Sequence, residues 1–308
     1  KGGVVAIRTD WLQELGLSEP KSMADVWDIA AAFKENNMGG TCTIGLGATK
    51  EISDMLAMKY LINAEGGLVS TWLEQDGELV YSLIQPEMKT ALSALHDKYA
   101  SGLLDQEYGT KSEQQLFEDA VSGKSGVVIC NMTAPFYLDN GISLGQEWGY
   151  YPLYNEDGGF APVEVSTSIG SVVVVSKDCK NPEAVIKIID YYVYILNDAY
   201  QDGTMSYDEI VQYTQNNMQH ATAPFTVTNS TSDYERYEMI QQALETGDES
   251  VLKTGGAAEV YHGIKRWNEQ KDLSCVGYAV QFDGTKSGVG IADQIIKEDR
   301  VVLSGLWG

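Results

Sequence analysis

The segment from Ser112 to Phe136, with the sequence SEQQLFEDAVSGKSGVVICNMTAPF, constrains the fold of this chain more than any other stretch. Ser112 and Gln115 have the spacing of a capping box, and apolar residues at helical spacing follow them. Gly123 is suited to end that helix because glycine adopts left-handed dihedrals without strain. Residues 126–131 are β-branched and almost free of polar side chains, which predicts a short strand buried on both faces.

The loop that follows this expected strand, residues 131–136, combines amide, hydroxyl and aromatic side chains with a stiffening proline. In open α/β sheets, ligands bind just beyond the carboxyl ends of the strands. We therefore expect this loop to contribute to a ligand site. Ordinary packing of a surface loop is the alternative.

The rest of the chain alternates between strand and helix patterns, which predicts an α/β architecture. Trp11 and Trp27 fall in helical apolar patterns and are expected in the core. Further strands are expected at residues 4–8, 41–46, 79–83, 148–153, 169–176 and 276–282. Further helices are expected to begin near Thr9, Ser22, Asp54, Pro86, Pro182, Ser206, Asp233, Gly255 and Ile291.

The composition excludes several classes of function. The 308 residues include 21 Lys and Arg against 44 Asp and Glu, a net charge of −23. Such an acidic chain is repelled by nucleic acid and by anionic membranes, so neither is an expected partner. No apolar run approaches the roughly 20 residues that span a bilayer. The four cysteines are too far apart in sequence for a zinc-binding pattern and are expected to be structural thiols, although disulfides remain possible.

Several short motifs resemble a known protein family when they are taken together. Residues 8–17, RTDWLQELGL, followed by Pro20 and a helix ending in Ala32-Phe33, are similar to extracellular solute-binding proteins of bacterial ABC importers. The resemblance is to family 1, the group like maltose-binding protein, and to its lipoprotein-type sugar binders. Further matching motifs follow in the family's order, at residues 65–67, 76–77, 103–105, 117–128 and 176–184. Each motif is weak alone, and the specificity comes from their order and spacing.

The resemblance implies an α/β fold of the type II periplasmic-binding-protein class, in which two lobes close about a hinge. It also implies that this chain lacks N-terminal and C-terminal parts. Residues 1–168 would form the core of the second lobe, and residues 169–225 a strand and helix that cross toward the first lobe. Residues 226–308 would be a helical return to the second lobe.

The function implied by the resemblance is to capture a carbohydrate, with an oligosaccharide expected, and to deliver it to the subunits of an ABC permease. We expect a monomer without cofactor or metal. The full-length protein would be lipid-anchored on the extracellular face of the cytoplasmic membrane, or periplasmic.

Sugar sites need aromatic faces for the rings and fixed polar groups for the hydroxyls. The resemblance places the family's ligand loop at the end of the buried strand. Ser53 and Asp54 lie where relatives direct a helix N-terminus at sugar hydroxyls, with plain helix capping as the alternative. Tyr151 lies on an aromatic strand that alternates between two faces, and Thr167 precedes the expected crossover strand. The candidate ligand residues are Asn131, Thr133, Phe136, Tyr137, Asp54, Ser53, Tyr151 and Thr167.

Enzymatic alternatives have less support in the sequence. Residues 141–145, GISLG, match the G-x-S-x-G pattern, but no strand is expected directly before them and no helix after them, as a nucleophile elbow requires. We therefore expect no catalytic residues. Two other possibilities stay open, namely a carbohydrate-active hydrolase with paired carboxylates and a surface adhesin that does not transport.

Overall fold

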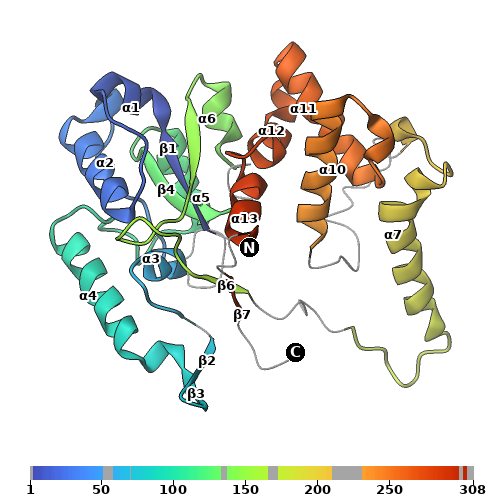
Figure 1. Ribbon diagram of the computed structural model, residues 1–308, viewed down its shortest axis with the longest axis horizontal. Helices are drawn as coiled ribbons and strands as arrows, with labels where there is room; N and C mark the ends of the chain where they lie inside the picture. Colours follow the sequence, from blue (N-terminus) through green and yellow to red (C-terminus); the bar gives the residue numbers. More distant parts are fainter. Residues whose placement is uncertain are drawn as a thin grey trace. The chain divides into compact units, whose positions relative to one another are not determined.

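The structure is a computed structural model that describes residues 3–50, 58–69, 71–132, 137–165, 173–209, 231–297 and 301–303 (Figure 1). The chain divides into unit 1, residues 1–167 and 285–308, and unit 2, residues 168–284. The chain returns to unit 1 at Thr285. The domain boundaries expected after residues 168 and 225, and the assignment of the segments to lobes, stay predictions.

A three-stranded antiparallel sheet forms the centre of unit 1, in the order β4-β1-β5. The strands are β1 (Gly3–Arg8), β4 (Val127–Asn131) and β5 (Trp148–Pro152). Every residue of β1 and β4 is buried, which confirms the burial predicted for the strand at residues 126–131. The strand expected at residues 41–46 is absent, and only isolated bridges at Leu46 and Gly47 extend the sheet. The amides of Thr43 and Ile44 both donate to the carbonyl of Lys124, a pattern that no regular ladder allows.

Several helices of unit 1 begin or end where local signals predict. The Ser22 hydroxyl accepts from the Asp25 amide at 3.1 Å, and Ser112 and Gln115 form the complete capping box. Gly123 has a φ of 80°, the left-handed conformation expected after the helix. The helices are α1 (Thr9–Leu15), α2 (Met23–Glu35), α3 (Met58–Ala64), α4 (Pro86–Ala100), α5 (Glu113–Val121), α6 (Asp139–Ser143) and α13 (Gly288–Lys297). Helix α6 is not among the expected helices, and α13 begins three residues before the expected Ile291.

Two smaller strand pairs complete the described part of unit 1. Strands β2 (Trp72–Gln75) and β3 (Glu78–Tyr81) form a hairpin around Asp76 and Gly77, which both have positive φ. Strand β6 (Val163–Val165) pairs in parallel with β7 (Val301–Leu303), from the other end of the chain.

The core of unit 1 lies between its sheet and α2. The rings of Trp11 and Phe33 pack edge to face with centroids 5.3 Å apart, and Trp27 is 1% exposed. The predicted core position of both tryptophans is thus confirmed. Gly126 lies so close to this pair that an added Cβ would approach Trp11 Cε3 to 2.5 Å. The residue before β4 must therefore be glycine for these rings to pack.

The described part of unit 2 contains helices joined by loops, and no strand. Its α-helices include α7 (Glu183–Gln201), α10 (Ser232–Thr246), α11 (Gly255–Gln270) and α12 (Val276–Phe282). The strand expected at residues 276–282 is therefore wrong. Val276, Ala279 and Phe282 are buried at a spacing of three residues, which places them on one face of a helix. Tyr278 of the same helix packs so closely on Gly263 of α11 that a Cβ added to Gly263 would lie 2.3 Å from the Tyr278 ring.

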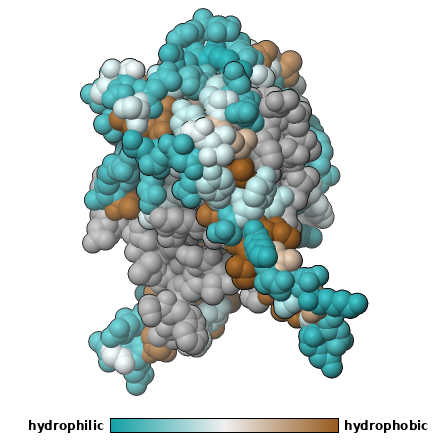
Figure 2. Space-filling model, turned by 90° about the vertical axis from the view of Figure 1, so that its right-hand side faces the viewer, coloured by the Kyte–Doolittle hydropathy of each residue, from teal (hydrophilic) through white to brown (hydrophobic). Residues whose placement is uncertain are grey.

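The strand expected at residues 169–176 is not found in its described part. Residues 173–176 have no strand structure, and Val174 is 85% exposed. A β-branched run forms a strand only beside another strand, and none pairs with these residues in the described part of the chain. Hydrophilic residues make up most of the coloured surface in Figure 2. Among the described residues, no helix is both long and apolar enough to cross a bilayer.

Candidate functional site

The first candidate site lies at the carboxyl end of β4. Asn131 is the last residue of this strand, pairs with Gly3 of β1 and is 4% exposed. Tyr137 is 45% exposed, and its ring stacks on Phe117 of α5 with centroids 5.1 Å apart. A buried amide and a partly exposed aromatic ring therefore border the predicted ligand loop.

The other residues predicted for this site lie outside the described residues. They are Thr133 and Phe136 of the loop, Ser53 and Asp54 before α3, and Thr167 after β6. Their roles stay predictions.

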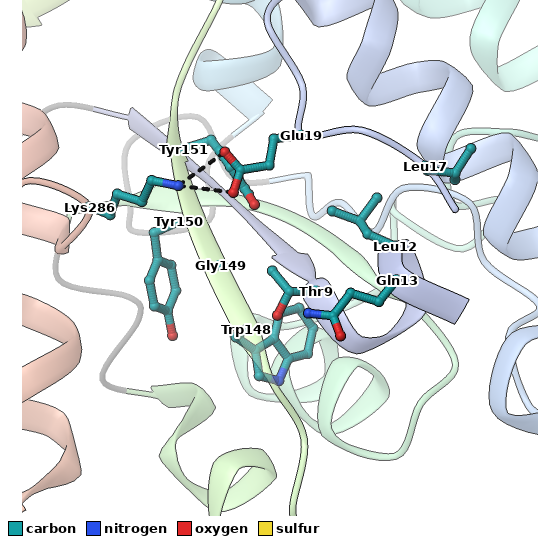
Figure 3. A pocket seen from close by; sticks show the side chains of 10 residues that line it. All are labelled: Thr9, Leu12, Gln13, Leu17, Glu19, Trp148, Gly149, Tyr150, Tyr151 and Lys286. Carbon is teal, nitrogen blue, oxygen red and sulfur yellow. Dashed lines mark hydrogen bonds and ion pairs between the residues drawn. The ribbon is translucent and has the colours of Figure 1, made fainter. Parts of the chain in front are cut away.

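The second candidate site is a pocket of about 420 Å³ in unit 1, which we call the β5 pocket (Figure 3). It lies along β5, where Tyr150 and Tyr151 point to opposite sides of the strand. Helix α1 and the segment that follows it form another wall, and Lys286, just before α13, closes one end. The lining residues are Thr9, Leu12, Gln13, Leu17, Glu19, Trp148, Gly149, Tyr150, Tyr151 and Lys286.

An ion pair and a buried phenol define the electrostatics of this pocket. Lys286 Nζ donates to the two carboxylate oxygens of Glu19 at 2.9 and 3.0 Å, and both side chains are well exposed. Burial, together with the negative charge of Glu19, raises the pKa of Tyr151 well above its ordinary value. Tyr151 therefore stays a neutral hydroxyl, and Lys286 lies 5.9 Å from the centroid of its ring.

The structure does not bring the described candidate residues into one pocket. Tyr151 pairs with Val5, which in turn pairs with Ile129, two residues before Asn131. Tyr151 lines the β5 pocket, whereas Asn131 and Tyr137 do not. The prediction from sequence missed Gln13, Glu19 and Lys286, since Lys286 is 267 residues from its ion-pair partner and no local pattern marks it.

In the described residues, the G-x-S-x-G match does not have the strand-turn-helix setting of a nucleophile elbow. Ser143 of the G-x-S-x-G match is the last residue of the five-residue helix α6 and follows no strand directly. The side chain of His96 is 76% exposed beside Asp97, and His262 belongs to unit 2, where Glu249 lies 3.3 Å away. No cluster of three His, Cys, Asp or Glu residues suited to a metal ion occurs in the part of the chain that the structure describes.

Relatives of known name match only part of the chain. The polygalacturonan/rhamnogalacturonan-binding protein YtcQ of Bacillus subtilis (strain 168) is 26% identical over 131 residues, which are 42% of this chain and 26% of that protein. Lipoprotein LipO of the same strain is 24% identical over 133 residues, 40% of this chain and 25% of that protein. Each match thus spans about a quarter of the relative's own length.

A solved structure and a family model match more of the chain. The alginate-binding protein AlgQ2, solved without calcium ion, aligns with 99% of this chain and 59% of its own, at 16% identity and a TM-score of 0.55. That likeness confirms the predicted fold class, the periplasmic-binding-protein-like fold. The family model described as bacterial extracellular solute-binding protein matches residues 2–193, well over half of the 308 residues. The chain therefore belongs to the bacterial extracellular solute-binding protein family, as its motifs predict.

Proposed function

We propose that this chain is part of the ligand-binding component of an ABC importer, which captures a carbohydrate, in particular an oligosaccharide, and delivers it to a permease. The observation that carries the proposal is the family match over residues 2–193. The name of YtcQ, a binder of polygalacturonan and rhamnogalacturonan, supports a saccharide ligand. The family binds solutes and is not catalytic, which supports binding without turnover.

The proposed ligand site is the loop after β4, with Asn131, Thr133, Phe136 and Tyr137. Stacking on Phe117 restricts the Tyr137 ring, which leaves it partly exposed in a fixed orientation. A fixed aromatic face suits the apolar side of a sugar ring, and the Asn131 amide and Thr133 hydroxyl suit sugar hydroxyls. Further contacts are proposed for Ser53, Asp54 and Thr167.

The proposed location and assembly are supported by the same family membership. An extracellular solute-binding protein works outside the cytoplasmic membrane, and the name of lipoprotein LipO supports a lipid anchor in the full-length protein. The partners would be the ligand and the permease subunits, and the binding component would act as a monomer.

The test is isothermal titration of the protein with a panel of oligosaccharides that includes fragments of polygalacturonan and rhamnogalacturonan. Chromatography of the same mixtures detects any cleavage. Binding without products is the expected result. Products would instead indicate a hydrolase, and no binding across the panel would favour an adhesin and contradict the proposal.

Loss of the loop's aromatic group should weaken binding. Phe136→Ala is expected to raise the Kd for the sugar about tenfold or more, since a buried aromatic contact with a sugar ring is expected to contribute about 1.4 kcal/mol or more. Tyr99→Ala removes a partly exposed tyrosine of α4 and serves as the control. Circular dichroism establishes that both variants fold. Equal affinity in Phe136→Ala and the unmodified protein would refute the assignment of the loop as the ligand site. The proposed transport function would still be supported by binding of an oligosaccharide from the panel.

A further inference from the structure

We propose that the β5 pocket is a second binding site, for one neutral sugar ring or a polyol of similar size, separate from the ligand site at the end of β4. Its volume of about 420 Å³ is within the range of small-molecule sites, about 300 to 1,000 Å³. Like such sites, it combines aromatic and aliphatic walls with a few polar groups.

The aromatic wall contains an indole that is held in place. Trp148 Nε1 donates to Gln146 Oε1 at 3.0 Å, and Gln146 Nε2 donates to the carbonyl of Val121 at 2.7 Å. Trp148 is only partly buried, so some of its ring surface reaches the pocket (Figure 3). A fixed indole can pack against the C–H face of a sugar ring at little entropic cost.

The polar groups that line the same pocket suit hydroxyls. Gln13 and Thr9, which both lie on α1, line the pocket together with Trp148 (Figure 3). A carboxamide donates and accepts at once, as does a hydroxyl. Vicinal hydroxyls of a sugar ring also donate and accept, so each can pair with either group.

The charges of the pocket favour a neutral ligand. Glu19 and Lys286 neutralise each other at 2.9 Å. An anion would have to compete with Glu19 for Lys286, and a cation would have to compete with Lys286 for Glu19. A hydroxyl can donate to the carboxylate and accept from the ammonium group while the pair stays intact. The pair therefore selects against charged sugars such as uronates.

Ligand-observed NMR titration of the 308-residue chain tests this proposal. The probes are methyl α-glucopyranoside, methyl β-galactopyranoside and galacturonate, each up to about 20 mM because one ring gives only weak affinity. At least one neutral glycoside is expected to bind, more tightly than galacturonate. No binding of either glycoside, or tighter binding of galacturonate, would overturn the proposal.

Variants locate the binding. Gln13→Ala is expected to weaken glycoside binding about threefold to tenfold, the effect of one lost hydrogen bond. Glu14→Ala is the matched control, since Glu14 is the next exposed residue of the same helix and does not line the pocket. Gln13 is exposed, so its loss should not impair folding. Equal effects of the two substitutions would overturn the proposal.

A third variant separates this site from the ligand loop. Phe136→Ala is expected to leave glycoside binding in the pocket unchanged while it weakens oligosaccharide binding. Loss of glycoside binding in Phe136→Ala but not in Gln13→Ala would mean that the loop binds both ligands and that the pocket binds neither. The proposed transport function would survive that result.

Discussion

A buried ion cluster in unit 1 provides the sharpest test of how this fold is held together. Lys111 Nζ lies 2.7 Å from Asp105 Oδ2 and 2.7 Å from Asp119 Oδ2. The side chains of Lys111, Asp105 and Asp119 are 8%, 2% and 10% exposed. Asp119 also pairs with Lys124 at 2.8 Å, whereas Lys124 itself is 53% exposed. Lys111 is thus the buried cation shared by two buried carboxylates.

Lys111→Met should destabilise unit 1 strongly. Asp119 would keep Lys124, but Asp105 would keep only the hydrogen bond from the amide of Glu107 at 3.0 Å. Removing one partner of a buried ion pair costs about 3 to 5 kcal/mol, because the remaining charge stays desolvated. We expect a loss near the lower end, about 3 kcal/mol, since one of the two carboxylates remains paired.

The assay is urea unfolding followed by tryptophan fluorescence, to which Trp11 and Trp27, buried in unit 1, contribute. Lys124→Met is the control and should cost less than about 1 kcal/mol, as exposed pairs do. Asp105→Asn in the Lys111→Met background should restore part of the loss, because it removes the unpaired charge. A loss under about 1 kcal/mol for Lys111→Met, or equal losses for the two lysine variants, would refute the reasoning.

The cluster also predicts a pH dependence. Burial opposes the charge of Asp119, but the hydrogen bonds and charges of Lys111 and Lys124 outweigh it and lower the pKa of Asp119 below 3.8. A carboxyl group whose pKa is lower in the folded than in the unfolded state stabilises the fold at pH values above its unfolded-state pKa. That stabilisation is lost as the pH falls through the folded-state pKa. Burial likewise opposes the charge of Lys111, yet Asp105 and Asp119 raise the pKa of Lys111 above 10.5, so its contribution is lost only at higher pH.

Two further substitutions test the core. Gly126→Ala would place a Cβ 2.5 Å from Trp11 and 2.6 Å from Phe33, and this overpacking should lower the free energy of unfolding in urea by about 1 to 3 kcal/mol. Gly109→Ala is the control, because no atom lies within 4 Å of a Cβ added there. Equal losses for the two variants would contradict the packing argument. Burial raises the pKa of Glu65 above 4.5 despite the hydrogen bond from Trp27, so the charged carboxylate costs the folded protein stability as the pH rises. Glu65→Gln removes that charge and should therefore raise the free energy of unfolding more at pH 7 than at pH 4. A stability difference from the unmodified protein that is the same at both pH values would contradict this assignment.

The helix boundaries could be predicted because their signals are local. Ser112 and Gln115 satisfy each other's backbone amides within one turn of helix. Gly123 takes the left-handed conformation that other residues adopt only with strain. Both effects depend on neighbours along the chain, so no tertiary contact is needed to predict them.

The wrong strand at residues 276–282 shows where local reasoning fails. Val276, Val280 and Phe282 have strand propensity, yet the segment is a helix with Val276, Ala279 and Phe282 buried on one face. A short apolar run fits both the helical and the strand periodicity of hydrophobic residues, and packing against α11 selects the helix here. The same holds at residues 41–46, where hydrogen bonds to Lys124 replace a strand ladder.

The sequence by itself determined the family, the fold class, the capped helices and the buried strand β4 of unit 1, since these depend on motif order, residue spacing and local hydrogen bonds. Only the tertiary structure decided the β5 pocket. Its ion pair joins Glu19 to Lys286, and its walls come from α1 and β5, which are far apart along the chain. Such a site arises from packing between distant segments, and residue spacing carries no information about that packing.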